Sequence, residues 1–356
     1  MSSLSTHYFQ TFDYLDTRDI ISLRQTNRFW HQLTTMTPIW TRLRFRGLPI
    51  VDWPALSSKV IGSSNHLLTV LDFEGVKIPS TVNTDQSSDD SSSTRSSSKT
   101  EKLITFWRNF STLHEHMSNL KTLKFGTVPL FVLQEMVHLP VVATEEDEVV
   151  PLGKLKVLSV VNLIDEKRSE EPVHLKDVVP VLERFSHVEA VSLNSNNGFV
   201  VLEDDGEVDG GEEQTDSQSK RREKVVQSLA AAFSKYTNLK SLSLTSIKDL
   251  TSAEFSQVLA GIGQQHSQLK TLELGSCASW NTTGGSEDST GPLDEVAKCT
   301  EVTTFKMVDV MVDSKARPLA LLFENLILVE RLSFENLKVD DSGKYTLCWW
   351  YSLLWN

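Results

Sequence analysis

The stretch Asn238-Leu239-Lys240-Ser241-Leu242-Ser243-Leu244 carries the pattern that decides the fold, because its leucines stand at offsets 0, +3 and +5. Large apolar residues return at the same three offsets seven more times, and we call this spacing the comb. The other copies are Leu68/Leu71/Phe73, Leu120/Leu123/Phe125, Leu155/Leu158/Val160, Val188/Val191/Leu193, Leu269/Leu272/Leu274, Val302/Phe305/Met307 and Val329/Leu332/Phe334.

The comb predicts a short strand in every copy. Residues at +3 and +5 point to the same side of a strand, so two large apolar groups enter the core together. A single copy also fits a half-buried strand of an ordinary domain, but eight copies favour stacked repeats that bury one another. Because a predicted helix precedes most copies, we expect parallel strands with helices on the outer side. The predicted helices are Glu101–Asn119, His174–His187, Arg222–Asn238, Thr251–Gln268, Pro292–Glu301 and Pro318–Val329.

Copies of the comb resemble leucine-rich repeats, whose signature is L-x-x-L-x-L at a regular period. This predicts an α/β leucine-rich-repeat solenoid over residues 55–356. Two intervals between copies reach 52 and 51 residues. Each contains a polar insertion that we expect to be disordered: a serine-rich one near 81–100 and an acidic one near 203–219. The ninth repeat position, usually Asn or Cys, matches only at Asn196 and Cys277, which predicts an irregular solenoid.

Composition narrows the function classes. The net charge of −12 argues against nucleic-acid binding, and most of it comes from Glu145–Glu148 and Glu203–Asp216. Three cysteines without a C-x-x-C pair indicate a reducing compartment. The chain has no apolar run long enough to span a membrane and no signal peptide pattern, so we expect a cytoplasmic or nuclear protein. Phosphate-binding and metal-binding motifs are absent, so we expect neither a cofactor nor an enzyme.

Residues 5–47 do not follow the comb. Their pattern of apolar residues and helix caps predicts a small helical module. Asp16 with Asp19 is a plausible N-terminal cap for a helix, and Asn27 is a plausible cap for the next. Thr37-Pro38 places proline at the start of a further predicted helix. We expect an apolar core that includes Trp30 and Trp40.

These residues resemble an F-box. The resemblance rests on Tyr14-Leu15-Asp16-x-x-Asp19-Ile20, on Asn27-Arg28-Phe29-Trp30-x-x-Leu33 and on Ile39-Trp40-x-x-Leu43-x-x-Arg46-Gly47. An F-box usually opens with Leu-Pro, which is absent here, and carries Val-Cys where this chain has Thr26-Asn27. The resemblance implies an F-box core or adaptor-binding set made of Phe9, Phe12, Leu15, Ile20, Leu23, Trp30, Leu33, Trp40 and Leu43.

F-box followed by leucine-rich repeats is similar to the substrate receptors of cullin–RING ubiquitin ligases. The resemblance implies that the module binds a Skp-family adaptor on a cullin scaffold, and that the repeats bind a protein substrate. Two alternatives remain: a helical cap that closes the solenoid, and an interaction scaffold not coupled to ubiquitination. The strand side chains that we expect on the concave, substrate-binding face are Ser192, Asn194, Ser241, Ser243, Thr245, Thr271, Glu273, Lys306 and Arg331.

The C-terminal segment Tyr345–Asn356 is rich in tryptophan and tyrosine. One interpretation is that it covers the last comb strand, because the end of a solenoid needs a cap. The other is that its aromatic residues contact the substrate.

Overall fold

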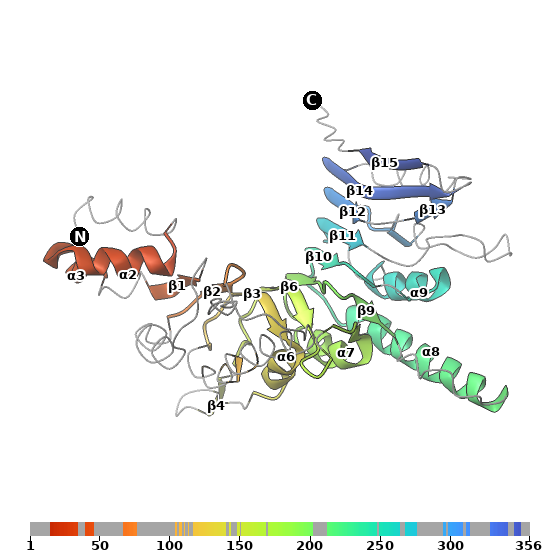
Figure 1. Ribbon diagram of the computed structural model, residues 1–356, viewed down its shortest axis with the longest axis horizontal. Coiled ribbons are helices and arrows are strands. Elements are labelled where there is room, and N and C mark those ends of the chain that lie inside the picture. Colours follow the sequence, from red (N-terminus) through yellow and green to blue (C-terminus); the bar gives the residue numbers. More distant parts are fainter. Residues whose placement is uncertain are drawn as a thin grey trace, which may run out of the picture. The chain divides into compact units, whose positions relative to one another are not determined.

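The computed structural model forms two compact units, residues 1–169 and 170–356, which are described separately (Figure 1). The residues that the structure describes are 15–34, 40–45, 67–76, 104, 107–108, 110, 113, 117–139, 142–143, 148–149, 151–168, 170–201, 212–247, 249–263, 268–275, 295–296, 298–308, 311–313, 328–340 and 345–349.

Unit 1 begins with two helices, α2 (Thr17–Thr26) and α3 (Arg28–Thr34). Asp16 caps α2: its Oδ1 accepts from Asp19 N at 2.9 Å, and Asp19 Oδ2 accepts from Asp16 N at 3.3 Å. Asn27 caps α3, because its Oδ1 accepts from Trp30 N at 3.0 Å. The expected caps are therefore present, and each satisfies a backbone N–H that the first helical turn leaves unpaired.

The end of the N-terminal module differs from the predicted helix. After a short 3₁₀ turn at 40–41, residues Arg42–Arg44 form strand β1, parallel to β2 (Val70–Phe73). Trp40, Leu43 and Phe45 stand at the comb offsets, and all three are buried. A ninth copy of the comb thus lies inside the predicted helical module. The module of 5–47 and the first repeats share one sheet.

The rest of unit 1 extends this sheet. Its parallel strands run in the order β1, β2, β3 (Thr122–Pro129) and β6 (Val157–Ile164), with Leu71, Leu123 and Leu158 in register. Strands β4 (Val142–Ala143) and β5 (Glu148–Val149) form a separate antiparallel pair. Aromatic rings fill the core behind the sheet. Stacked or edge-to-face pairs join Phe45, Phe73, Phe125, Trp107 and Phe110.

Helix α6 (Leu130–Val137) follows β3 directly and was not predicted. Its residues Leu130, Val132, Leu133 and Met136 are buried, and the unbroken apolar run 130–133 directly follows the strand. Such a short apolar run does not distinguish a strand from a buried helix by period alone.

Unit 2 repeats the strand–helix alternation. Its elements are β7 (Val173–His174), α7 (Leu175–Arg184), β8 (Ala190–Leu193), β9 (Phe199–Val200), α8 (Glu212–Ser234), β10 (Ser241–Leu244), α9 (Ser252–Gly263), β11 (Thr271–Gly275), β12 (Thr304–Val308), β13 (Met311–Asp313), β14 (Arg331–Asp340) and β15 (Tyr345–Trp349). Strands β8, β10, β11, β12 and β14 are parallel neighbours in that order, with their comb residues in register. β7 and β9 form a separate parallel pair.

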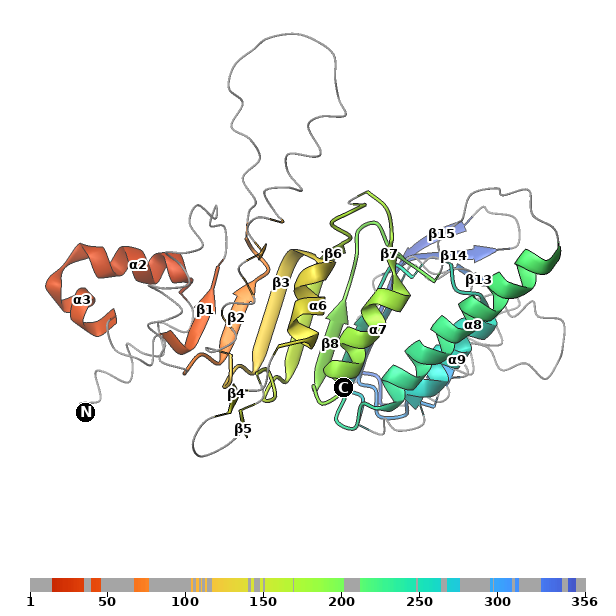
Figure 2. The ribbon, with the colours of Figure 1, turned by 90° about the horizontal axis from the view of Figure 1, so that it is seen from below.

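The helices of unit 2 lie side by side on one side of its sheet (Figure 2). Where α8 and α9 cross, Gly261 allows the close approach, because a Cβ there would lie 2.5 Å from Ala230 O. At the end of α8, the buried Tyr236 hydroxyl donates to Leu182 O at 2.9 Å and joins α8 to α7.

Helix α8 begins ten residues before the predicted start at Arg222. Part of the acidic insertion expected near 203–219 is therefore helical, from Glu212 onward. The reason is local: glutamate and glutamine are good helix formers, and acidic side chains favour the N-terminal end of a helix dipole.

Seven of the eight predicted comb copies are buried as expected. In the last copy, Val329, Leu332 and Phe334 are only half-buried, because this copy is the last of the stacked repeats. Strand β15 pairs antiparallel with β14, so this part of the aromatic C-terminal segment lies along the last comb strand. The predicted helix Glu101–Asn119 is described only in part, and there Trp107, Phe110 and Leu113 are buried. Of Pro292–Glu301 only part is described, including two helical residues, and most of Pro318–Val329 lies outside the described residues.

Candidate protein-binding surfaces

Polar contacts attach the N-terminal helices to the sheet. The buried Thr17 Oγ1 accepts from Arg44 N at 3.0 Å, which ties the start of α2 to β1. The Trp40 indole Nε1 donates to Thr34 O at 2.8 Å, which ties the end of α3 to the turn before β1. The Trp40 bond is buried, so losing the indole would leave the Thr34 carbonyl unpaired in the core, whereas the Thr17 bond is only partly buried.

The predicted F-box core is only partly buried. Ile20, Trp40 and Leu43 are buried, whereas Leu15, Leu23 and Trp30 are half-buried. Phe9 and Phe12 lie outside the described residues, as does the side chain of Leu33.

Sequence reasoning missed Phe29 as a surface residue of this module. Its side chain is 53% exposed, and its ring lies edge-on to Trp30 with centroids 5.2 Å apart. The sequence did carry a signal for this. Phe29 directly precedes Trp30, and neighbouring residues on a helix point in different directions, so both could not face the core.

We call the side of each sheet that carries the third, fifth and seventh residues of every comb copy the open strand face. In unit 1 the described residues of this face include an ionic cluster. Glu74 Oε1 accepts from Lys124 Nζ at 3.3 Å and from Ser159 Oγ at 3.2 Å, across three neighbouring strands. Gly126 leaves room for the adjacent backbone, because a Cβ there would lie 2.7 Å from Glu74 O. Val161 on the same face is exposed.

The open strand face of unit 2 carries a longer network of polar side chains across β10, β11, β12 and β14. Ser243 Oγ donates to Glu273 Oε2 at 2.9 Å, and Lys306 Nζ lies 3.1 Å from Glu273 Oε1 and 3.0 Å from Glu335 Oε1. Burial alone would lower the pKa of Lys306, but its hydrogen bonds to Glu335 and Glu273 outweigh that and raise it. The ammonium therefore stays charged at neutral pH.

A second set of hydrogen-bonded side chains on this face, all of them neutral, lies beside this network. Thr245 Oγ1 donates to Asn194 Oδ1 at 2.5 Å, and Asn194 Nδ2 donates to Ser192 Oγ at 3.5 Å. Seven of the nine predicted face residues are on strands, while Asn194 and Thr245 directly follow the ends of β8 and β10. The structure brings together Ser243, Glu273 and Lys306 as one group, and Ser192, Asn194 and Thr245 as another. Ser243 is buried beneath its neighbours, whereas Arg331 is exposed; Ser241, Thr271 and Arg331 occupy the row of third positions.

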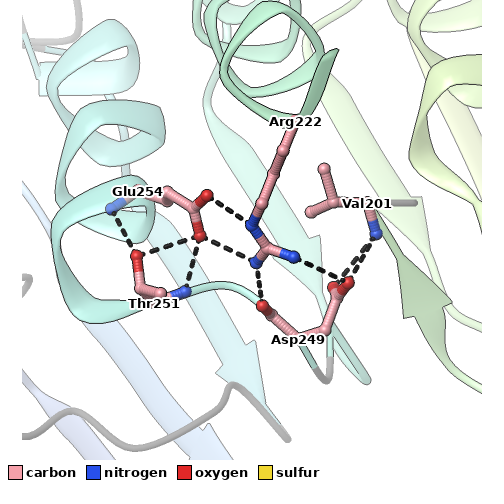
Figure 3. Close-up of polar contacts among 5 residues, drawn as sticks. All are labelled: Val201, Arg222, Asp249, Thr251 and Glu254. Carbon is pink, nitrogen blue, oxygen red and sulfur yellow. Dashed lines mark hydrogen bonds and ion pairs between the residues drawn. The ribbon is translucent and has the colours of Figure 1, made fainter. Parts of the chain in front are cut away.

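A further polar cluster joins α8 and α9, and sequence reasoning missed it (Figure 3). The Arg222 guanidinium binds Glu254 through two bonds of 2.5 and 2.8 Å and also contacts the Asp249 carboxylate at 3.3 Å and the Asp249 backbone oxygen. The Asp249 carboxylate accepts from Val201 N at 3.0 Å. One aspartate therefore contacts both the Val201 backbone, which precedes α8, and the Arg222 side chain on α8.

The same cluster caps α9. Thr251 Oγ1 accepts from Glu254 N at 3.3 Å, and Glu254 Oε2 accepts from Thr251 N at 2.8 Å. The spacing T-x-x-E before an apolar run was the available sequence signal for this capping box. The cluster positions helices, and it lies away from the open strand face.

Within the described ranges, no group of three or more His, Cys, Asp or Glu side chains is arranged to hold a metal ion. A search of the same residues finds no helix with the length and apolar character needed to cross a bilayer.

Comparison with known proteins identifies the N-terminal module. Residues 9–46 match the family model described as F-box-like. No curated protein matches the chain. Among solved structures, an internalin from Listeria monocytogenes aligns over 89% of this chain with 11% sequence identity and a TM-score of 0.41. The alignment spans 66% of the internalin. The chain therefore has an F-box-like segment at residues 9–46, followed by a parallel sheet with leucine-rich-repeat spacing, and this arrangement resembles that of the F-box leucine-rich-repeat proteins.

Proposed function

We propose that this protein is the substrate-recognition subunit of a Skp–cullin–F-box ubiquitin ligase, and so acts in the ubiquitin conjugation pathway without catalysing a step itself. The F-box-like segment binds a Skp-family adaptor on the cullin scaffold, and the open strand face binds a protein substrate. The observation that carries the proposal is the match of residues 9–46 to the F-box-like model, on a segment whose last strand joins the repeat sheet.

The chemistry of the open strand face supports binding of a protein. In unit 2 most of its residues are small or half-buried polar side chains, with hydroxyl groups and alternating charges such as Glu273 and Lys306. Alternating charge of this kind favours specificity for a partner with a complementary pattern. It offers no row of basic residues for phosphates, and we propose neither nucleic acid nor membrane as a partner. The proposed compartment is the cytoplasm or the nucleus.

Binding of the full-length chain to a purified Skp-family adaptor tests the proposal. We expect a stable complex that co-elutes in gel filtration. The substitution Ile20→Asp places a charge in the buried interior of α2 and should abolish the complex, whereas the exposed control Arg18→Ala should leave it intact. A wild-type chain that folds but does not bind the adaptor would remove the ligase proposal.

The second candidate is an interaction scaffold that is not coupled to ubiquitination. The specific observation in its favour is that the Leu-Pro opening of an F-box is absent and that Thr26-Asn27 replaces the usual Val-Cys. A chain that captures a partner through its strand face without binding the adaptor would support this candidate.

The role of the open strand face has its own test. Lys306→Glu would place three carboxylates together, with Glu273 and Glu335, and should repel the substrate that the wild type binds. Adaptor binding should not change, because the variant lies far along the chain from residues 9–46. Equal substrate ubiquitination by the variant and the wild type would show that this face is not the substrate site.

A further inference from the structure

The F-box-like segment has a charge that is opposite to that of the chain. The whole chain has a net charge of −12, yet no Asp or Glu occurs between Asp19 and Asp52. Five arginines fall in that interval, at positions 24, 28, 42, 44 and 46. A local excess of positive charge on an acidic protein steers association with an acidic surface.

Among the described residues of this segment, Phe29 is a large aromatic residue with an exposed side chain. Phe29 stands on the first turn of α3, 53% exposed, with its ring edge-on to the half-buried Trp30. The fold of the segment depends on other side chains: Ile20 and Trp40 are buried, and Trp40 holds the end of α3 through its bond to Thr34. Phe29 therefore contributes more to the surface than to the core.

Basic groups surround this aromatic side chain in the sequence and on the two helices. Arg28 and His31 are exposed on α3, and Arg24 is half-exposed on the last turn of α2, which only Asn27 separates from α3. Among the described residues of the segment, the acidic ones are Asp16 and Asp19, which lie at the opposite end of α2 and form its capping box. The end of the helix pair that carries the exposed Phe29 therefore also carries Arg24 and Arg28.

We propose that the F-box-like segment docks on its adaptor through Phe29, and that the adaptor's docking face is an apolar pocket bordered by acidic side chains. This inference rests on the proposed function, because it names the contact within the adaptor interface. A rigid aromatic ring that is already exposed contributes much apolar contact at small entropic cost, and such residues dominate interfaces. The arginines accelerate encounter and add salt dependence, while the ring sets the lifetime of the complex.

The test measures association and dissociation rates of the full-length chain on an immobilised, purified Skp-family adaptor at two salt concentrations. Phe29→Ala should weaken binding by about tenfold or more, mainly through faster dissociation. Arg24→Gln with Arg28→Gln should slow association at low salt and flatten its salt dependence. Circular dichroism of each variant checks that the helices are retained.

Matched controls come from unit 1 outside residues 9–46. Leu67 is 47% exposed, so Leu67→Ala removes a comparable apolar surface, and Lys121→Gln removes an exposed positive charge. Neither should change either rate. If the wild type binds and Phe29→Ala binds equally well, the inference is overturned while the proposed function stands. If the folded wild type does not bind the adaptor, the proposed function fails and this inference fails with it.

Discussion

Replacing Trp40 by alanine is expected to release strand β1 from the sheet of unit 1. The side chain is 3% exposed, and its indole donates to Thr34 O at 2.8 Å. Truncating a buried tryptophan costs about 3–5 kcal/mol, and the buried Thr34 carbonyl is left unpaired as part of that cost. Trp30 is only half-buried, so Trp30→Ala should lower the free energy of unfolding by only about 1–2 kcal/mol.

Hydrogen exchange followed by mass spectrometry resolves this difference, because it reports local opening as well as global unfolding. Amides of residues 40–45 and 67–76 report on the pairing of β1 with β2, for example Phe45 N, which donates to Asp72 O at 2.8 Å. In Trp40→Ala these amides should exchange between about a hundredfold and several thousandfold faster. Trp40→Phe keeps most of the ring but removes the indole hydrogen bond, so it should cost about 1 kcal/mol plus the lost volume.

Two results would refute this reasoning. If Trp30→Ala accelerates exchange in β1 as much as Trp40→Ala does, then Trp30 is the anchor and the burial argument is wrong. If Trp40→Ala leaves exchange in β1 unchanged, the strand is not held by its comb residues.

Three further predictions concern unit 2. Burial alone would raise the pKa of Glu254, but its bonds to Arg222 and Thr251 lower it below the ordinary 4.5. This carboxylate therefore stabilises the fold above pH 4.5, and that contribution is lost as pH falls through the lowered folded pKa. Arg222→Gln should flatten this part of the melting-temperature profile measured from about pH 7 to 3. Gly261→Val should destabilise by about 1–3 kcal/mol or more in urea unfolding, since its Cβ would meet Ala230 O. Deleting residues 345–356 should cause association visible in light scattering, because β14 loses the strand on one edge; a monomeric deletion variant that fails to bind substrate would instead identify a contact site.

The repeat sheet was predictable because its signal is periodic and local. Leu242, Leu272 and Phe305 occupy the same comb position, and the structure places them in register on neighbouring strands. Burying two large residues per strand requires every copy to stack with the same face inward, and a shift by one residue would turn that face to water. The sequence pattern therefore determines both the strand positions and the residues of the open strand face.

The contacts across the open strand face were less predictable. Ser243, Glu273 and Lys306 share the fifth position, so the comb places them in one row. The link from Lys306 to Glu335, however, joins a fifth to a seventh position, and it depends on the directions that two flexible side chains take. Arg222 was missed for a similar reason, because its partners Asp249 and Glu254 follow it by 27 and 32 residues on another repeat.

The boundary between the F-box-like segment and the repeats follows from the same argument. Strand β1 lies within residues 9–46, yet Leu43 packs in register with Leu71, and Phe45 stacks on Phe73 with centroids 5.0 Å apart. A fragment that ended at residue 47 would expose both apolar side chains and leave the β1 edge unpaired. The F-box-like segment therefore depends on the first repeats for its own fold, and binding of the adaptor has to be measured on a chain that retains them.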